Sequence, residues 1–277
     1  MRQPRQMKVR CTFRSASHLR YNALVPPQER TLQTEAIVLR HNDWGEADRL
    51  LWLYTRKGGK LRALAKGVRK IRSRKAGHLQ PFTRSTLLLA RGRDFWIVTQ
   101  AETIDAYLQL RGDLARVGYA SYVVELLDRF TYEGDDNLDL YRLVRDTLSR
   151  LESAPDPAVT LRYYEIHLLD LLGYRPRLFQ CLRCGKEIQP EDQYFSIDQG
   201  GALCPECGPL TIGARPISVD TLRYLRHFQR SSFSAISSLS LSPELNRQLE
   251  LFLGNYFTYY LERALNTPDF IRLVKRG

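Results

Sequence analysis

Two different spacings of hydrophobic residues divide the chain. In the first part, short hydrophobic runs, one of them rich in β-branched residues and one alternating with basic residues, are typical of β-strands. They predict five strands, at residues 34–40, 49–55, 60–65, 82–90 and 95–102. In the third of these, the alternation places Leu61, Ala63 and Ala65 on one face of the sheet and the basic Lys60 and Arg62 on the other.

The number and length of these strands indicate a barrel. Five short strands favour a small closed β-barrel of the oligonucleotide-binding (OB) type, and an SH3-like barrel is the alternative. A stretch rich in Gly, Lys, Arg and Ser at residues 66–77 interrupts the sheet and predicts a loop between the third and fourth strands. We therefore expect an OB-fold domain at residues 31–105.

From residue 106 onward, hydrophobic residues recur at three- and four-residue spacing, which is the period of an amphipathic helix. The pattern predicts helices at residues 114–132, 138–152, 158–172, 219–229 and 243–265. A cysteine-containing segment at residues 178–212 separates the third helix from the fourth. The expected fold class is α+β, with an N-terminal OB-fold β-barrel followed by an α-helical domain, residues 106–277, that carries the cysteine module.

Composition narrows the class of protein. The 277 residues are 43% hydrophobic and 26% charged, which is typical of a globular chain and excludes wholesale disorder or a fibrous fold. No hydrophobic run approaches the roughly 18 residues that span a bilayer, so we expect no membrane association. Five cysteines are too few for a disulfide-stapled secreted scaffold, and a cytoplasmic location is expected.

The N-terminal segment, residues 1–30, contains seven basic residues and one acidic residue, without the hydrophobic core of a secretory signal. Its composition superficially fits an organellar transit peptide. We expect it to be a basic, disordered tail, because it lacks the hydrophobic residues that build a packed core.

The positive charge is concentrated in one region. The chain has a net charge of +12, and residues 57–93 contain twelve basic residues and no acidic one. Outside this region and the tail, acidic residues are in excess. A local basic region on an acidic body is typical of a polyanion-binding site, and a flexible loop can neutralise phosphates without a rigid constellation. We predict that nucleic acid is bound by Lys60, Arg62, Lys66, Arg69, Lys70, Arg72, Arg74 and Lys75.

Two alternatives accompany this prediction. The basic loop has the composition of a solvated charge run or of a localisation signal. Aromatic side chains near it either stack on bases or fill the barrel core. These are Trp44, Trp52, Tyr54, Phe82, Phe95 and Trp96.

Four cysteines form the most specific motif. Cys181 and Cys184 are separated by two residues, as are Cys204 and Cys207, and a glycine follows each pair. The nineteen residues between the pairs are within the spacing of four-cysteine zinc sites, and residues 194–197 and 200–203 predict a hairpin that brings the pairs together. Four thiolates fill the coordination sphere of a tetrahedral ion, so we expect one structural Zn²⁺. Two disulfides or a thioredoxin-like redox pair are the alternatives.

The chain lacks the common catalytic motifs: the P-loop, GxGxxG, HExxH and GxSxG patterns are absent, and its five histidines are scattered. We therefore expect no enzymatic activity. Asp43, Glu46 and Asp48 are expected to cap and orient the loop between the first two strands. The alternative is a nucleic-acid-processing enzyme in which these carboxylates bind a metal.

Several segments resemble the bacterial RecO family. In the first half these are residues 34–40, 45–50, 59–61 and 66–70. In the second half they are Gly173, Tyr174 and Pro176, the two cysteine pairs, residues 194–196 and residues 200–201. The resemblance covers residues 31–270 in the same order.

This resemblance implies a mediator of DNA repair and homologous recombination. Proteins of this kind bind single- and double-stranded DNA without sequence preference and anneal complementary strands. With RecR, and often RecF, they load RecA onto DNA coated by single-strand-binding protein, which implies a bacterial, nucleoid-associated location. We also expect an apolar groove between the late helices to take a partner's tail. The alternative is an RNA-binding or ribosome-associated zinc protein, because a barrel with a basic loop does not by itself select the sugar.

Overall fold

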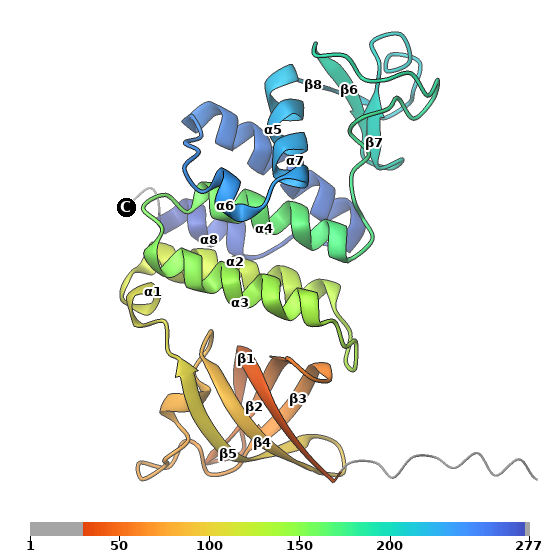
Figure 1. Ribbon diagram of the computed structural model, residues 1–277. Coiled ribbons are helices and arrows are strands. Elements are labelled where there is room, and N and C mark those ends of the chain that lie inside the picture. The colour runs from red at the N-terminus through yellow and green to blue at the C-terminus, as the bar shows by residue number, and fades with distance from the viewer. Residues whose placement is uncertain (1–29, 275–277) are drawn as a thin grey trace, which may run out of the picture.

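The computed structural model describes residues 30–274. The expected disordered tail at residues 1–30 therefore lies, apart from Arg30, outside the described residues. Figure 1 shows three levels: a β-barrel at one end, stacked helices in the middle and a small sheet at the other end. No helix in the described range is long and apolar enough to cross a membrane.

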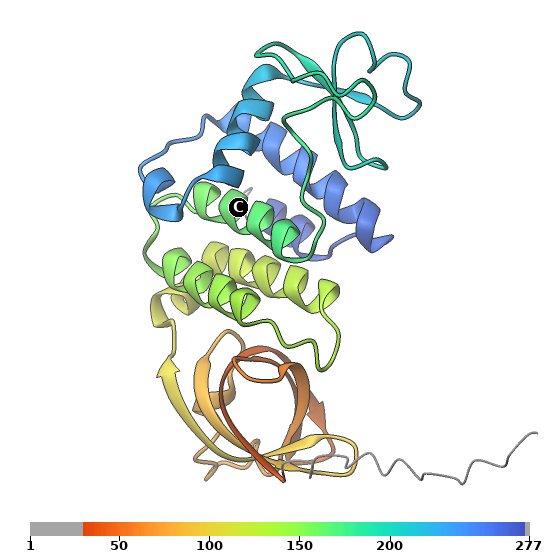
Figure 2. The same ribbon diagram turned by 45° about the vertical axis from the view of Figure 1, so that its right-hand side comes forward.

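The barrel contains strands β1 (Thr31–Trp44), β2 (Asp48–Thr55), β3 (Gly59–Ala65), β4 (Arg84–Arg91) and β5 (Trp96–Asp105). Their order around the barrel is β1-β2-β3-β5-β4, closed by pairing of β4 with β1, as Figure 2 shows from another side. Strands β3 and β5 pair in parallel, and the other neighbouring strands pair antiparallel. The expected closed OB-like barrel is confirmed.

Two strand limits differ from the sequence prediction for local reasons. Strand β1 is longer than expected because a bulge between Val38 and Arg40 lets its first half pair with β4 and its second half with β2. Strand β4 begins at Arg84 instead of at Phe82, because Phe82 has a φ of 69°, outside the β region.

The predicted alternation in β3 is correct. Leu61, Ala63 and Ala65 are buried in the barrel interior, whereas Lys60 and Arg62 lie on its outer side. After β3, residues 66–76 form a turn-rich loop that ends in a single 3₁₀ turn, Gly77–Leu79. Leu79 is fully buried in the same core, so the end of this loop is fixed to the barrel.

Helices α1 (Leu108–Gly112), α2 (Leu114–Phe130) and α3 (Leu138–Ser153) cover one side of the barrel. Their core is continuous with the barrel, because Ile37, Leu39 and Tyr54 belong to the same buried cluster as the helices. Polar contacts cross the junction as well. Glu35 of β1 accepts a hydrogen bond from the Tyr141 hydroxyl of α3 at 3.0 Å.

The remaining helices are α4 (Ala158–Leu171), α5 (Val219–Arg230), α6 (Phe233–Ile236), α7 (Pro243–Leu261) and α8 (Thr267–Val274). The single helix expected at residues 243–265 is wrong: α7 ends at Leu261, where Glu262 turns into the left-handed region at a φ of 52°. The chain then returns as α8, which packs on α2. The Glu125 carboxylate of α2 accepts hydrogen bonds from the backbone N–H groups of Asn266 and Thr267.

The cysteine module lies between α4 and α5. Strands β6 (Gln193–Ser196) and β7 (Gly201–Leu203) form the expected hairpin, and β8 (Arg215–Ile217), which the sequence pattern did not indicate, pairs with the other edge of β6. Figure 1 places this module at the end of the molecule opposite the barrel.

A buried ionisable cluster joins α2 to α4. Glu165 is fully buried, accepts a 2.6 Å hydrogen bond from the Tyr122 hydroxyl and lies 3.1 Å from the Arg162 guanidinium. Burial raises the pKa of Glu165 to about 7, although Arg162 and the Tyr122 hydroxyl favour its ionised form.

We predict that Glu165 makes the protein less stable as the pH rises. Since its folded pKa exceeds the unfolded value of 4.5, folding takes up a proton between about pH 4.5 and 7, and the free energy of unfolding falls as the pH rises through this window. The loss is on the order of 2–3 kcal/mol. Glu165→Gln keeps an acceptor for Tyr122 but cannot titrate. Urea unfolding of both proteins from pH 5 to 8 should show a flatter slope for the variant.

The difference in slope between wild type and Glu165→Gln reports Glu165 alone, because both proteins retain His41 and His167. Burial lowers the pKa of both histidines, so they act with the opposite sign. Equal slopes for wild type and variant contradict the assignment.

Candidate nucleic-acid interface and metal centre

The loop at residues 66–76, here called the basic loop, is attached to the barrel near its start. Val68 is 1% exposed and belongs to the barrel core. The Gly67 N–H donates to the Asp48 carboxylate at 2.7 Å, and the Arg69 N–H donates to the Ala47 carbonyl at 2.9 Å. The β1–β2 turn and the base of the loop therefore form one unit.

Two carboxylates, at the end of β1 and at the start of β2, hold this unit together. Asp43 lies 3.3 Å from both Arg49 and Arg69, and Asp48 anchors Gly67. Among the described residues, the four cysteines form the one group of ligand-type side chains close enough to hold a metal ion, and Asp43, Glu46 and Asp48 do not form a second. The contacts of Asp43 and Asp48 agree with the expected orienting role of these two carboxylates, whereas that role remains a prediction for the exposed Glu46.

Beyond its attachment, the basic loop presents free cations. Lys66, Lys70, Arg72 and Arg74 are exposed, and within residues 30–274 none of them has an ion-pair partner. Arg69 is also exposed, but its guanidinium pairs with Asp43 and donates to the Gly45 carbonyl at 3.2 Å. Four unpaired cations on one short loop are available for phosphate.

Lys75 points back to the barrel. Its ammonium group donates to the Val98 carbonyl at 2.9 Å and is partly buried, and this burial lowers the pKa of Lys75. The position of its side chain fixes the end of the loop to β5 and leaves it less available to a ligand than its exposed neighbours.

Lys60 and Arg62 lie apart from the basic loop, at the junction with the helices. The Lys60 ammonium is 2.7 Å from the Asp128 carboxylate of α2, donates to the Thr131 carbonyl at 3.0 Å and belongs to a side chain that is only 11% exposed. Arg62 forms an ion pair with Glu133, which follows α2. The structure therefore does not bring these two predicted DNA-binding residues together with the other six.

The aromatic residues divide into two groups. Tyr54 and Phe82 are buried, and Trp52 lies beneath the Arg40 guanidinium, which is 3.5 Å from the centre of its ring. These three serve the core and the junction. The other three, Trp44, Phe95 and Trp96, are at least partly exposed on the barrel.

A cavity of about 340 Å³ lies on this side of the barrel, between β3 and the β4–β5 turn. Arg91, Arg93 and Trp96 line it. The two arginines belong to the acid-free run of the sequence, but the prediction of DNA-binding residues omitted them. Only the fold shows that the β4–β5 turn and β3 enclose a common space.

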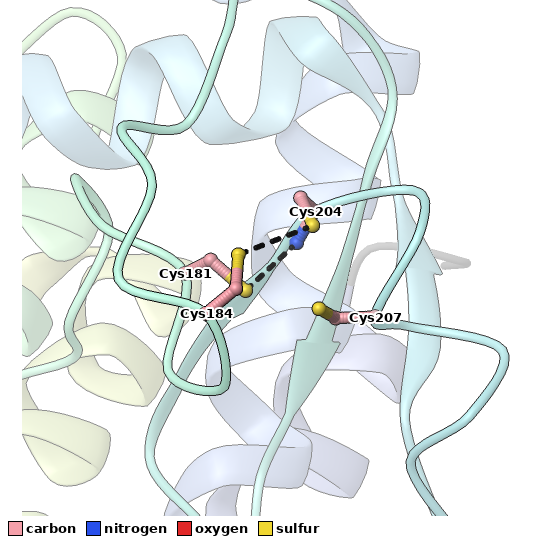
Figure 3. Close-up of side chains that lie close together, drawn as sticks. All are labelled: Cys181, Cys184, Cys204 and Cys207. Atoms are coloured by element: carbon pink, nitrogen blue, oxygen red, sulfur yellow. Dashed lines mark hydrogen bonds between the residues drawn. The ribbon is translucent and has the colours of Figure 1, made fainter.

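The four cysteines converge as their spacing predicts. Cys181 and Cys184 come from one loop, and Cys204 and Cys207 from a second loop facing it, with the sulfur atoms directed to a common centre (Figure 3). All four sulfurs lie within 4.8 Å of one another, and the cysteines are free of disulfides. The Cys184 and Cys204 sulfurs are 3.8 Å apart, which matches the edge of about 3.8 Å of a tetrahedron with Zn–S bonds of about 2.3 Å.

Local backbone geometry prepares the cluster for a metal. Gly185 has a φ of 72°, and a Cβ on Gly208 would lie 2.1 Å from the Tyr194 ring, so both turns require glycine. Burial alone raises the pKa of the Cys181 thiol, but backbone N–H groups of Cys184 and Cys204 outweigh this and lower the pKa to about 6. Burial and the neighbouring cysteines raise the pKa of Cys207 to about 12. The cluster without a metal therefore favours one thiolate, at Cys181, and a bound cation would be needed to stabilise the others.

A second cavity, of about 290 Å³, lies between α2, α4, α7 and α8. Leu251 and Ile271 contribute apolar lining, and Arg162 lies at its buried side with a guanidinium nitrogen that has no hydrogen-bond partner. This opening among the late helices therefore combines apolar side chains with a buried, incompletely paired cation, and Asp156, Glu250 and Asp269 also line it.

Together, the barrel, its cationic loop and the four-cysteine cluster define an OB-barrel protein with an exposed basic surface and a separate module whose four cysteines could hold a metal ion. Both halves of the chain match models of known protein families. Residues 30–107 match the model described as Recombination protein O N terminal, and residues 111–269 match Recombination protein O C terminal. The chain belongs to the RecO family of DNA repair proteins.

Individual relatives agree over nearly the whole chain. The chain is 41% identical to the DNA repair protein RecO of Roseiflexus sp. (strain RS-1), over 90% of this chain and 88% of that protein. It is 37% identical to DNA repair protein RecO of Dehalococcoides mccartyi (strain CBDB1), over 87% of this chain and 96% of that protein. The resemblance inferred from the sequence segments is confirmed.

We predict that Lys60 stabilises the fold. Lys60→Met leaves the Asp128 carboxylate with less compensation in a mostly buried position and should lower the free energy of unfolding by about 3 kcal/mol. The affinity of the folded variant for DNA should change little. Denaturant unfolding and fluorescence anisotropy with a labelled strand measure the two quantities.

Lys57→Met is the matched control. Lys57 is an exposed cation three residues away, and its replacement should change stability by at most about 0.5 kcal/mol. A stable Lys60→Met protein that no longer binds DNA would show that Lys60 belongs to the DNA-binding surface.

Proposed function

We propose that this protein is a recombination mediator that binds single- and double-stranded DNA without sequence preference and anneals complementary strands. The observation that carries the proposal is the set of exposed, unpaired cations on the basic loop: Lys66, Lys70, Arg72 and Arg74. Cations without carboxylate partners bind phosphate at little internal cost, since no existing ion pair has to break. Phosphate contacts carry no sequence information, and binding is therefore non-specific and steeply salt-dependent.

Annealing follows from the same chemistry. Two complementary strands approach each other against the repulsion of their phosphates, and a cationic loop lowers that repulsion without occupying the base edges that must pair. No bond is made or broken, so the activity is non-enzymatic. The DNA-binding residues in this proposal are Lys66, Lys70, Arg72 and Arg74, with Arg69 as a partly paired fifth cation and Lys75 as an anchor.

We assign a structural Zn²⁺ to Cys181, Cys184, Cys204 and Cys207. Four sulfur donors are the set that zinc takes in structural sites, and they leave no position for water. The ion would tie the two loops of the module together, at the end of the molecule opposite the basic loop. The module has only three short strands of its own, so its fold depends strongly on such a link.

The protein partners in this proposal are RecR and single-strand-binding protein, with RecF and RecA as further partners at the bacterial nucleoid. Arg162 supports a carboxylate-bearing tail as the ligand of the cavity between α2, α4, α7 and α8, because its guanidinium is buried and incompletely paired there. We assign the expected groove for a partner's tail to this cavity.

We predict that reversing three loop charges abolishes DNA binding at moderate salt. The triple variant Lys70→Glu, Arg72→Glu, Arg74→Glu removes three phosphate contacts, and the slope of log K against log[salt] for a single strand should decrease in magnitude by about 2. Annealing of complementary strands, followed by fluorescence transfer, should slow in parallel.

The control carries the same change of net charge in the helical domain: Arg142→Glu, Arg175→Glu, Arg247→Glu. If it weakens binding as much as the loop variant, total charge is responsible and the assignment to the loop fails. Matched DNA and RNA oligomers, measured in the same series, test the RNA-binding alternative through a preference for RNA.

We predict that Cys181→Ser releases the metal and destabilises the module. One missing thiolate leaves three donors, so zinc content measured by mass spectrometry should fall to background and the free energy of unfolding should fall by several kcal/mol. Cys11→Ser, which alters the fifth cysteine, is the control and should retain zinc. A metal-free Cys181→Ser protein with wild-type stability contradicts a structural role.

A further inference from the structure

The cavity between β3 and the β4–β5 turn, here called the barrel cavity, has the lining of a base-binding site. Its volume of about 340 Å³ is near the lower end of the range of small-ligand sites, which suits one nucleoside and excludes a duplex. Two aromatic rings, Phe95 and Trp96, and three arginines, Arg62, Arg91 and Arg93, line it. Stacking surfaces and cations therefore occur together in one enclosed space.

The rings are held in place before any ligand arrives. Gly92 closes the turn with a 3.1 Å hydrogen bond to the Phe95 carbonyl, and a Cβ at this position would lie 2.3 Å from that oxygen. The Phe95 ring contacts Trp44 edge-on at 5.7 Å and lies 5.1 Å from the Arg62 guanidinium. The Arg91 guanidinium lies 5.0 Å from the centre of the Trp96 ring. Such fixed planes lower the cost of ordering the site when a base stacks on them.

The charges inside the cavity separate phosphate from base. Arg91 and Arg93 are exposed at the rim, and within the described chain neither has a carboxylate partner. Asp94 and Glu133 line the same space. Carboxylates repel phosphate, so the phosphates of a strand would lie nearer to the arginines. The unpaired arginines therefore suit the backbone, and the rings of Phe95 and Trp96 suit the uncharged base.

Contacts across the barrel connect this cavity to the basic loop. Arg69 of the loop binds Gly45 of the β1–β2 turn and Asp43 near the end of β1, and Trp44, the last residue of β1, contacts Phe95 at the cavity. A strand whose phosphates follow the loop has a continuous path across the β1–β2 turn to the cavity.

We propose that the barrel cavity binds an unpaired base of a single strand, stacked at Phe95 and Trp96, with the adjoining phosphates at Arg91 and Arg93. This inference rests on the proposed function and adds a selective site to it. In a duplex the bases are paired and stacked, so they do not enter the cavity, and the basic loop alone binds duplex DNA. The two surfaces together give single strands an advantage that phosphates do not provide.

The experiment compares three probes of equal length at one salt concentration: an oligothymidine strand, the same strand with abasic sites throughout, and a blunt duplex. Wild-type protein should bind the thymidine strand on the order of tenfold more tightly than the abasic strand, which keeps the phosphates but lacks the bases. Phe95→Leu should remove this preference and leave duplex affinity unchanged. Arg91→Gln should weaken binding of the thymidine and abasic strands alike.

We choose Phe95 and Arg91 for substitution. Trp96 also packs against the barrel core, so its replacement risks unfolding the protein. Tyr259→Leu is the matched aromatic control, since Tyr259 is 48% exposed on α7. Equal wild-type affinity for thymidine and abasic strands overturns the base site, as does a Phe95→Leu protein that loses single-strand and duplex binding equally. A wild-type protein that binds none of the probes overturns the proposed function as well.

Discussion

The arrangement of the molecule depends on one carboxylate, that of Asp128 on α2. It receives the Lys60 ammonium from β3 at 2.7 Å and the Arg40 guanidinium from β1 at 3.0 Å, so it fixes two strands of the barrel to the first long helix. Apolar packing around Tyr54 supplies most of the contact, but it has no direction. The ion pairs and hydrogen bonds set the angle between barrel and helices, and through it the side of the barrel that stays open to solvent.

This junction explains why the cations of one acid-free segment have different roles. Residues 57–93 have no acidic residue among them, yet carboxylates from elsewhere in the chain reach several of their cations: Asp128 reaches Lys60, Glu133 reaches Arg62, and Asp43 reaches Arg69. Those cations hold the fold. The exposed tip of the basic loop and the β4–β5 turn lie beyond the reach of these carboxylates, so their charge remains available. Carboxylates from outside residues 57–93 thus define the basic surface by pairing with part of it.

The sequence predicted the features that depend on neighbours along the chain. The alternation of β3, the hairpin of β6 and β7 and the convergence of the four cysteines follow from spacing alone. Features that join distant segments were not predictable: Lys60 and Asp128 are 68 residues apart, and Glu125 meets Asn266 across 141 residues. The barrel cavity belongs to the second class. Its residues were visible as aromatic and basic positions, but their enclosure required the parallel pairing of β3 with β5.

The attachment of the basic loop has a consequence for the entropy of binding. Val68 and Lys75 fix the loop near both ends, and Leu79 fixes the turn that follows, so only a short central stretch is free to move. A long untethered basic tail gives up the freedom of its whole backbone when it wraps a ligand, at about 1–2 kcal/mol for each residue that becomes fixed. Here folding has already ordered most of the loop. Few residues lose freedom on contact with phosphate, so the ordering of the loop offsets little of the free energy that its phosphate contacts contribute.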